Sequence, residues 1–137
     1  MTDFISTAMS ETSILARSKR LYNKASAVYN ITRIPRYAFV SEIYVRVDTA
    51  MSGGTANSGS LLVGFSGNKE TADPDGFIDS VADVEVAGMY KMSWDGCPFS
   101  QGKWFNDGSG MLTITIDTGD HTTLMDAYIF TQYSVLY

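Results

Sequence analysis

Short runs of apolar residues recur along the chain, and clusters of polar turn residues separate them. In the clearest run, residues 37–48, Ile43, Val45 and Val47 share one parity while Val40 falls on the other. Successive side chains of a strand point to opposite faces, so this pattern indicates a strand that is partly covered on both sides.

Several further runs are rich in β-branched and aromatic residues, which favour strands. In the last one, Tyr128 and Phe130 share one face while Ala127 and Ile129 share the other, so both faces are largely apolar. This pattern predicts a central strand whose aromatic side chains lie at a rim or face a neighbouring subunit. The predicted strands, besides 37–48, cover residues 25–34, 60–66, 76–86, 89–94, 111–117 and 124–136.

Turn chemistry appears every 10 to 20 residues between these runs. The pair Asp-Gly begins at Asp75, Asp95 and Asp107, and it favours tight turns because both residues tolerate positive φ. Many short strands without a long helical pattern predict an all-β, antiparallel β-sandwich or barrel. The predicted loops and turns are residues 51–60, 73–76, 93–99, 105–110 and 117–122.

The N-terminal part is harder to assign. Residues 1–11 have no sustained period and are interpreted as an arm, whereas residues 12–22 suit either a helix or a strand. We favour a strand because residues 25–34 continue with strand-forming types. The predicted organisation is an arm or hairpin over residues 1–24, followed by one β-sandwich domain over residues 25–137.

Charge is divided unevenly along the chain, which carries a formal net charge of -5. Residues 1–46 sum to +4 and residues 47–137 to -9. This division argues against a partner that is nucleic acid, which requires a broad basic face. It fits a basic segment that docks on an acidic neighbour, although a merely solvated basic face is the alternative. The candidate partner-binding residues are Arg17, Lys19, Arg20, Arg33 and Arg36.

Other chemistry is sparse in the sequence. Cys97 is the only cysteine, which excludes an internal disulfide and a zinc site with several cysteines. No run of about 18 apolar residues and no secretory leader is present, so we expect a protein that neither spans a membrane nor follows the usual secretory route. No motif for a nucleotide or other cofactor occurs, and none is expected.

Two polar groupings deserve consideration as sites. His121, the only histidine, lies beside Asp120 in a predicted turn, but adjacent positions rarely supply the geometry of a catalytic triad. A second grouping is acidic and can offer several oxygens to Ca²⁺. Its members, Asp73, Asp75, Asp79 and Asp83, are interpreted instead as a turn cap and solvent-facing strand residues, so no metal site and no catalytic residue is predicted.

An aromatic grouping surrounds Trp94 and Trp104, which lie ten residues apart. Tyr90, Phe99 and Phe105 are close to them in sequence. Such a grouping can form a flat platform for a sugar, but packing in the core of a sandwich is the commoner use of aromatic residues.

An Ile-Pro step precedes alternating valines in IPRYAFVSEIYVRVDTA, at residues 34–50. Four further segments accompany it: LLVGFSG at 61–67, DPDGFIDSVAD at 73–83, MLTITIDTG at 111–119 and DAYIFTQYSVLY at 126–137. Together these segments resemble a family of small structural proteins of tailed bacteriophages. The likeness extends over about residues 31–137, and residues 1–30 have no counterpart in it.

The resemblance implies a jelly-roll head protein, usually a decoration or cement protein on the capsid exterior. It implies a virion protein made in the host cytoplasm, with the major capsid protein and further copies of itself as partners, and a trimer is the first expectation for the oligomer. The basic segment Arg17–Arg36 is then expected to meet an acidic capsid or subunit surface. A fibre or a receptor- or carbohydrate-binding module is the alternative. No enzymatic activity is expected.

Overall fold

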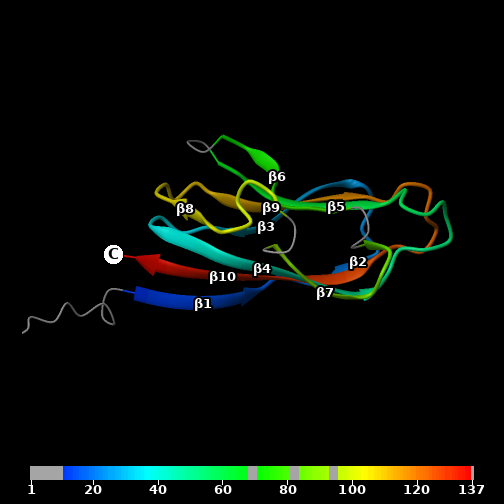
Figure 1. Ribbon diagram of the computed structural model, residues 1–137, viewed down its shortest axis with the longest axis horizontal. Helices are drawn as coiled ribbons and strands as arrows, with labels where there is room; N and C mark the ends of the chain where they lie inside the picture. Colours follow the sequence, from blue (N-terminus) through cyan, green and yellow to red (C-terminus); the bar gives the residue numbers. More distant parts are fainter. Residues whose placement is uncertain (1–10, 68–70, 81–83, 93–95, 137) are drawn as a thin grey trace, which may run out of the picture.

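A computed structural model of the chain describes residues 11–67, 71–80, 84–92 and 96–136. Within these residues, strands form two antiparallel sheets that pack face to face (Figure 1). The predicted all-β antiparallel sandwich is therefore confirmed. The strands are β1 (Glu11–Arg17), β2 (Leu21–Tyr22), β3 (Ala27–Arg33), β4 (Ala38–Thr49), β5 (Ser60–Ser66), β6 (Asp73–Ser80), β7 (Gly88–Lys91), β8 (Lys103–Phe105), β9 (Met111–Asp117) and β10 (Asp126–Leu136).

The two sheets differ in size. The six-stranded sheet has the order β1-β10-β4-β7, and the short strands β2 and β8 pair with β10 and β4. The four-stranded sheet has the order β3-β9-β5-β6. The longest strands, β4 and β10, lie side by side at the centre of the larger sheet, which confirms the central position predicted for the last strand.

The core lies between the sheets and takes one face of each strand. In β10, Ala127, Ile129 and Thr131 are buried, whereas Tyr128 and Phe130 on the opposite face are only partly covered. This division matches the alternation seen in the sequence. The described residues include no helix that is long and apolar enough to cross a bilayer.

Aromatic rings fill one part of this core. The Phe65 ring meets Phe105 edge to face at 5.4 Å between centroids, and it lies 5.7 Å from Phe77. Edge-to-face geometry is favoured between aromatic rings, and these rings bury large apolar areas. They therefore fix the distance between β5, β6 and β8.

The strand assignment for residues 12–22 is confirmed in place of a helix, although the span is divided: β1 begins one residue earlier, at Glu11, β2 ends at Tyr22, and Asn23 follows with a positive φ. The predicted arm falls largely in residues 1–10, which are outside the described part. β1 itself pairs along its whole length with β10, from Glu11 opposite Leu136 to Arg17 opposite Phe130. The N-terminal strand is therefore part of the larger sheet.

The turn predicted over residues 73–76 is wrong, because these residues begin β6. β6 is the last strand of its sheet. Pro74 is tolerated there because an edge strand has a hydrogen-bonded neighbour on one side only, so a missing N–H need not break the sheet. Gly64 on β5 permits the backbone of β6 to come close, since a Cβ at position 64 would lie 1.9 Å from the Asp73 carbonyl oxygen. β8, by contrast, was not predicted, because three residues are too few to show alternation.

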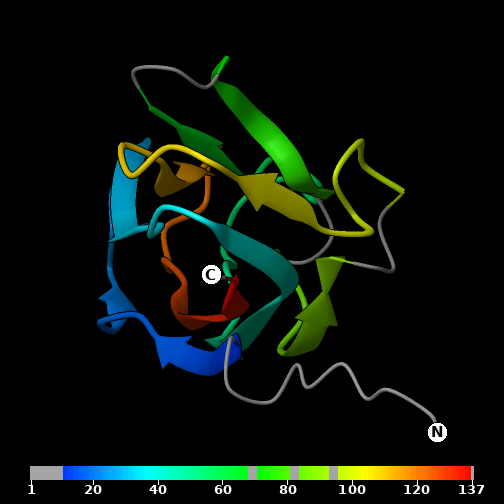
Figure 2. The same cartoon turned by 90° about the vertical axis from the view of Figure 1, so that its left-hand side faces the viewer.

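The long axis of the sandwich separates two ends. At one end, the loop between β4 and β5 lies beside the turn between β9 and β10, and we call this the loop end (Figure 1). At the other end, β4 begins, β10 finishes and β8 lies alongside, and Figure 2 looks onto this end. We call it the aromatic end because Tyr37 and Trp104 are exposed there.

Candidate interaction surfaces

Three of the predicted partner-binding residues lie at the end of β1 and in the connection to β2. Arg17 places its guanidinium 5.2 Å from the centre of the Tyr128 ring, and Lys19 is exposed. Arg20 has a structural role, because its Nε and Nη2 donate to the two carboxylate oxygens of Asp126 at 2.7 and 2.6 Å. This hydrogen bonding holds the pKa of Asp126 below its usual range.

Arg33 and Arg36 lie elsewhere. Arg33 donates to the Gly108 carbonyl at 3.4 Å, and Arg36 precedes Tyr37, whose carbonyl accepts the N–H of Leu136. Arg20 is bound at the first residue of β10 and Arg36 lies near its last, so roughly 33 Å of strand separates them at about 3.3 Å per residue. The five basic residues therefore do not form one patch.

The open edge of the sandwich, where β1 and β3 face each other, has two adjoining hollows. Their volumes are about 160 and 240 Å³, and Ser18, Lys19 and Ile31 line both. Ile31 is the apolar residue that lines both hollows, whereas exposed Leu15 and Val28 lie on the opposite outer faces of the two sheets, across from Gln132 and Thr115. We call this region the β1–β3 edge, and it combines apolar surface with the cations of Arg17 and Lys19.

The outer faces of the two sheets differ in chemistry. On the six-stranded sheet, the rings of Tyr128 and Phe130 lie under the Arg46 guanidinium at 4.8 and 5.6 Å. Arg46 also donates to the Asp48 carboxylate at 2.9 Å. On the four-stranded sheet, the corresponding face carries small and hydroxyl side chains such as Thr115. Tyr128 and Phe130 thus lie on the outer face of a central strand, and their contact with a neighbouring subunit stays a prediction.

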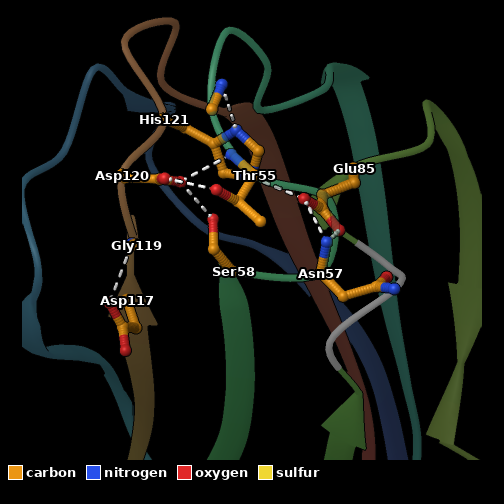
Figure 3. Close-up of polar contacts among 9 residues, drawn as sticks. Thr55, Asn57, Ser58, Glu85, Asp117, Gly119, Asp120 and His121 are labelled. Carbon is orange, nitrogen blue, oxygen red and sulfur yellow. Dashed lines mark hydrogen bonds and ion pairs between the residues drawn. The ribbon is translucent and has the colours of Figure 1, made fainter.

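The loop end contains the densest polar network (Figure 3). The Asp120 carboxylate accepts hydrogen bonds from the Thr55 N–H at 2.7 Å, the Thr55 hydroxyl at 2.6 Å and the Ser58 hydroxyl at 2.7 Å. The hydrogen bonds from Thr55 and then Ser58 lower the pKa of Asp120 well below its usual range. Asp120 thereby ties the β9–β10 turn to the β4–β5 loop.

His121 makes a second tie at this end. Its Nδ1 accepts the N–H of Gly54 at 3.2 Å, and its Nε2 lies 2.5 Å from Oε1 of Glu85 (Figure 3). Because Nδ1 is an acceptor, the ring carries its proton on Nε2 and donates it to Glu85. Glu85 also accepts the N–H of Asn57. The imidazole, with 3% of its side chain exposed, connects three separate segments.

The acidic residues around β6 are spread along the strand. Asp73 and Asp75 are in contact, and burial, followed by the hydrogen bond with Asp75, raises the pKa of Asp73. Asp79 lies farther along β6 and is exposed, and Asp83 is outside the described residues. Where the structure describes the chain, no group of three or more acidic, histidine or cysteine side chains is placed to hold a metal ion. The proposed role of Asp73 as a turn cap is wrong, because it begins a strand.

The aromatic grouping is divided by the fold. Phe105 is fully buried and Phe99 packs against the core, whereas Trp94 is outside the described residues. Trp104 is 41% exposed, and its stacking partner is Tyr37, with ring centres 6.2 Å apart and planes at 26°. The sequence grouping missed Tyr37 because that residue is distant along the chain and meets Trp104 only through the pairing of β8 with β4.

Comparison with known proteins gives similarity in structure alone, since no family model and no curated protein sequence matches the chain. One similar solved chain belongs to the acid-stable capsid structure of Helicobacter pylori bacteriophage KHP30, with a TM-score of 0.62, 15% identity, and 93% of this chain and 98% of that chain covered. Another belongs to the cyanophage Pam1 capsid asymmetric unit, with a TM-score of 0.69, 10% identity, and 98% and 93% covered.

These likenesses define the fold class. The chain is a two-sheet β-sandwich of a kind that also occurs in two phage capsid structures. Because each alignment covers more than nine tenths of both chains, the matched chains are close to this one in length. In both structures, therefore, the fold corresponds to a whole small chain.

Proposed function

We propose that this chain is a structural component of a phage particle, and specifically a decoration or cement protein on the outside of the head. The observation that carries the proposal is the whole-length structural likeness to small chains of two phage capsid structures. A separate small chain suits the role of an added component of a shell, and this supports the proposal of a decoration protein. The resemblance in sequence to small phage structural proteins points in the same direction.

The order of the strands supports a jelly-roll type of sandwich. The first strand, β1, lies beside the last, β10, and among the eight main strands every successive pair except β5 and β6 passes from one sheet to the other. Two interleaved Greek keys of eight strands generate this kind of order, with β2 and β8 as short additions. Jelly rolls serve as building units of capsids and as binding modules, so function follows from their surfaces.

The proposed mechanism requires no catalytic residue. A protein that binds the assembled shell and not its separate subunits stabilises the shell by mass action. A symmetric oligomer, for which we propose a trimer, gains avidity when several of its copies contact the shell together. In this proposal the polar groups of His121, Asp120 and Glu85 hold loops in place and carry out no chemistry.

We propose that the β1–β3 edge makes the contact with the major capsid protein or with the next copy of the chain. It offers Arg17 and Lys19 beside Ile31 and Leu21, and this mixture suits an acidic partner surface with an apolar centre. Arg20 contributes indirectly, since its bridge to Asp126 fixes the connection after β1. Arg33 and Arg36 lie farther along the molecule, beside Gly108, and are not part of this edge.

The proposal is tested by adding purified protein to heads of the phage that encodes this chain, prepared without it. We expect saturable binding and a higher temperature of DNA release from the heads. The free protein in solution should have three times the mass of the 15.0 kDa chain. Lys19→Glu should weaken binding strongly. Lys91→Glu makes the same charge change at the opposite edge of the sheet, where Lys91 pairs with Glu42; once circular dichroism shows this variant to be folded, it should leave binding intact. Heads that do not bind the unaltered protein would contradict the proposal.

A further inference from the structure

The aromatic end holds two rings in solvent on a rigid support. Trp104 pairs with Phe39 across β8 and β4, while its neighbour Phe105 points into the core and is fully buried. Because Phe105 is held in the core, Trp104, the preceding residue, is held on the outer face of the sheet. Its partner Tyr37 is 39% exposed and stacks on it at 6.2 Å, with the planes 26° apart.

The backbone at Tyr37 is unusual. Its φ of 62° lies in the left-handed region, which bulky residues rarely adopt. The hydrogen bond from the N–H of Leu136 to the Tyr37 carbonyl, at 2.8 Å, holds this conformation in place. Backbone outliers of this kind cluster at binding and functional sites, where the surrounding structure maintains them. Here the conformation keeps the Tyr37 ring beside Trp104.

A polar hollow of about 360 Å³ adjoins the stacked rings. Arg36, Asn106, Asp107 and Gly108 line it, and the Arg36 guanidinium lies 4.6 Å from the centre of the Tyr37 ring. Oδ1 of Asp107 accepts the N–H of Ser109 at 3.0 Å, which orients the carboxylate. The volume is within the range of small-molecule sites, roughly 300–1,000 Å³.

Stacked rings beside planar polar groups match the chemistry of a sugar. A pyranose presents an apolar C–H face that packs on an aromatic ring, and hydroxyl pairs at its rim that bind amide, carboxylate and guanidinium groups in a bidentate manner. Arg36 and Asp107 give the lining of the hollow one positive and one negative charge, which suits a neutral sugar. Arg36 links the hollow to the rings, since it lines the hollow and its guanidinium lies over the Tyr37 ring.

We propose that the aromatic end binds a neutral glycan, with one pyranose on the Trp104–Tyr37 stack and the next in the hollow formed by Arg36, Asn106 and Asp107. This inference is independent of the attachment to a capsid, because the aromatic end lies where β10 finishes, whereas Lys19 precedes β2, which pairs with the start of β10. On a particle, it would give the protein a second role, which is contact with carbohydrate outside the particle.

A glycan array that includes neutral bacterial polysaccharide fragments provides the first test, and isothermal titration with the best neutral oligosaccharide provides the second. Trp104→Ala should lower the affinity at least tenfold, and Asn106→Ala, in a loop, should lower it several-fold. Trp104→Phe, which keeps a ring, should retain most of the binding. Tyr22→Ala removes another exposed aromatic residue far from the hollow and should change affinity less than twofold.

Three results would overturn the inference. They are no binding to any neutral glycan at millimolar concentration, binding restricted to anionic glycans, and binding that Trp104→Ala and Asn106→Ala leave unchanged. Circular dichroism of each variant shows whether it is folded, and Asn106→Ala remains informative if Trp104→Ala fails to fold. Head binding by the same variants is measured in parallel, so that loss of sugar binding is distinguished from loss of the proposed cement function.

Discussion

The two ends of the sandwich differ in whether their functional groups are engaged within the chain or exposed to solvent. At the loop end, Asp120, His121 and Glu85 bond to groups of the same chain and join loops that are distant in sequence. At the aromatic end, Tyr37 and Trp104 remain exposed beside a polar hollow. The first arrangement stabilises the fold, and the second displays a surface.

This difference shows why residue type alone is a poor guide to function. The histidine and its acidic neighbour have the composition of a catalytic site, yet both ring nitrogens of His121 are engaged in holding loops together. Trp104, which composition assigns to the core, is partly exposed. The contrast predicts that substitutions of engaged residues lower the stability of the fold more than substitutions of exposed ones.

The largest effect is expected at the aromatic end, between two adjacent residues. Phe105→Ala should lower the free energy of unfolding by about 3–5 kcal/mol, because it leaves a cavity among buried rings. Trp104→Ala should cost less, about 1–2 kcal/mol, since the residue is 41% exposed and loses only part of a full burial. Urea unfolding measures both. Equal costs would mean that Trp104 is a core residue and would remove the contrast.

The loop end is tested through its histidine. His121→Ala should cost about 1–3 kcal/mol, because it leaves the Gly54 N–H and the Glu85 carboxylate without their partner. Glu85→Gln keeps an acceptor oxygen for the His121 Nε2–H and should cost less. Urea denaturation of the two variants gives the comparison. A His121→Ala variant as stable as the natural chain would show that the network is not structural.

Arg20 and Lys19 provide a third comparison, within the basic residues. Arg20→Ala should lower the melting temperature, since it removes two hydrogen bonds to Asp126, whereas Lys19→Ala should leave it nearly unchanged. Arg20→Lys keeps the charge and loses the two-pronged geometry, so an intermediate value is expected. Differential scanning fluorimetry is sufficient. If Lys19→Ala melts lower than Arg20→Ala, the assignment of roles is reversed.

The smallest effect concerns pH. The pKa of Asp120 is lower in the folded chain than the ordinary value of about 3.9, so its charged form stabilises the fold above that pH, and the stabilisation is lost as the pH falls through the folded pKa. The difference in melting temperature between the natural chain and Asp120→Asn should therefore shrink below about pH 4. A difference that stays constant from pH 7 to pH 2.5 would contradict this assignment.

The sequence predicted the sandwich and most strands, because alternation is a local property that the valine-rich and threonine-rich runs display directly. Ile43 and Val45, for example, are buried and paired as their pattern indicates. The prediction failed at Asp73 to Gly76, where turn-forming residues begin an edge strand opposite Gly64. That outcome depends on a partner strand, which local pattern does not contain.

The candidate surfaces were predicted less well than the fold. The basic residues were identified by type, but their separation into Arg17, Lys19 and Arg20 on one side and Arg33 and Arg36 on the other depends on strand pairing. Tyr37 and Trp104 meet because β8 pairs with β4, over a separation in sequence that no motif spans. Surfaces of a β-sandwich are assembled from distant strands, so their residues become visible only in the folded chain.

The most direct test of the proposed role is an electron cryomicroscopy reconstruction of particles of the phage that encodes this chain. The account predicts density for a two-sheet sandwich at symmetry-related positions on the outside of the head, with the β1–β3 edge against the shell or a neighbouring copy. Heads that bear no such density, or a chain found only in the tail or inside the shell, would contradict it.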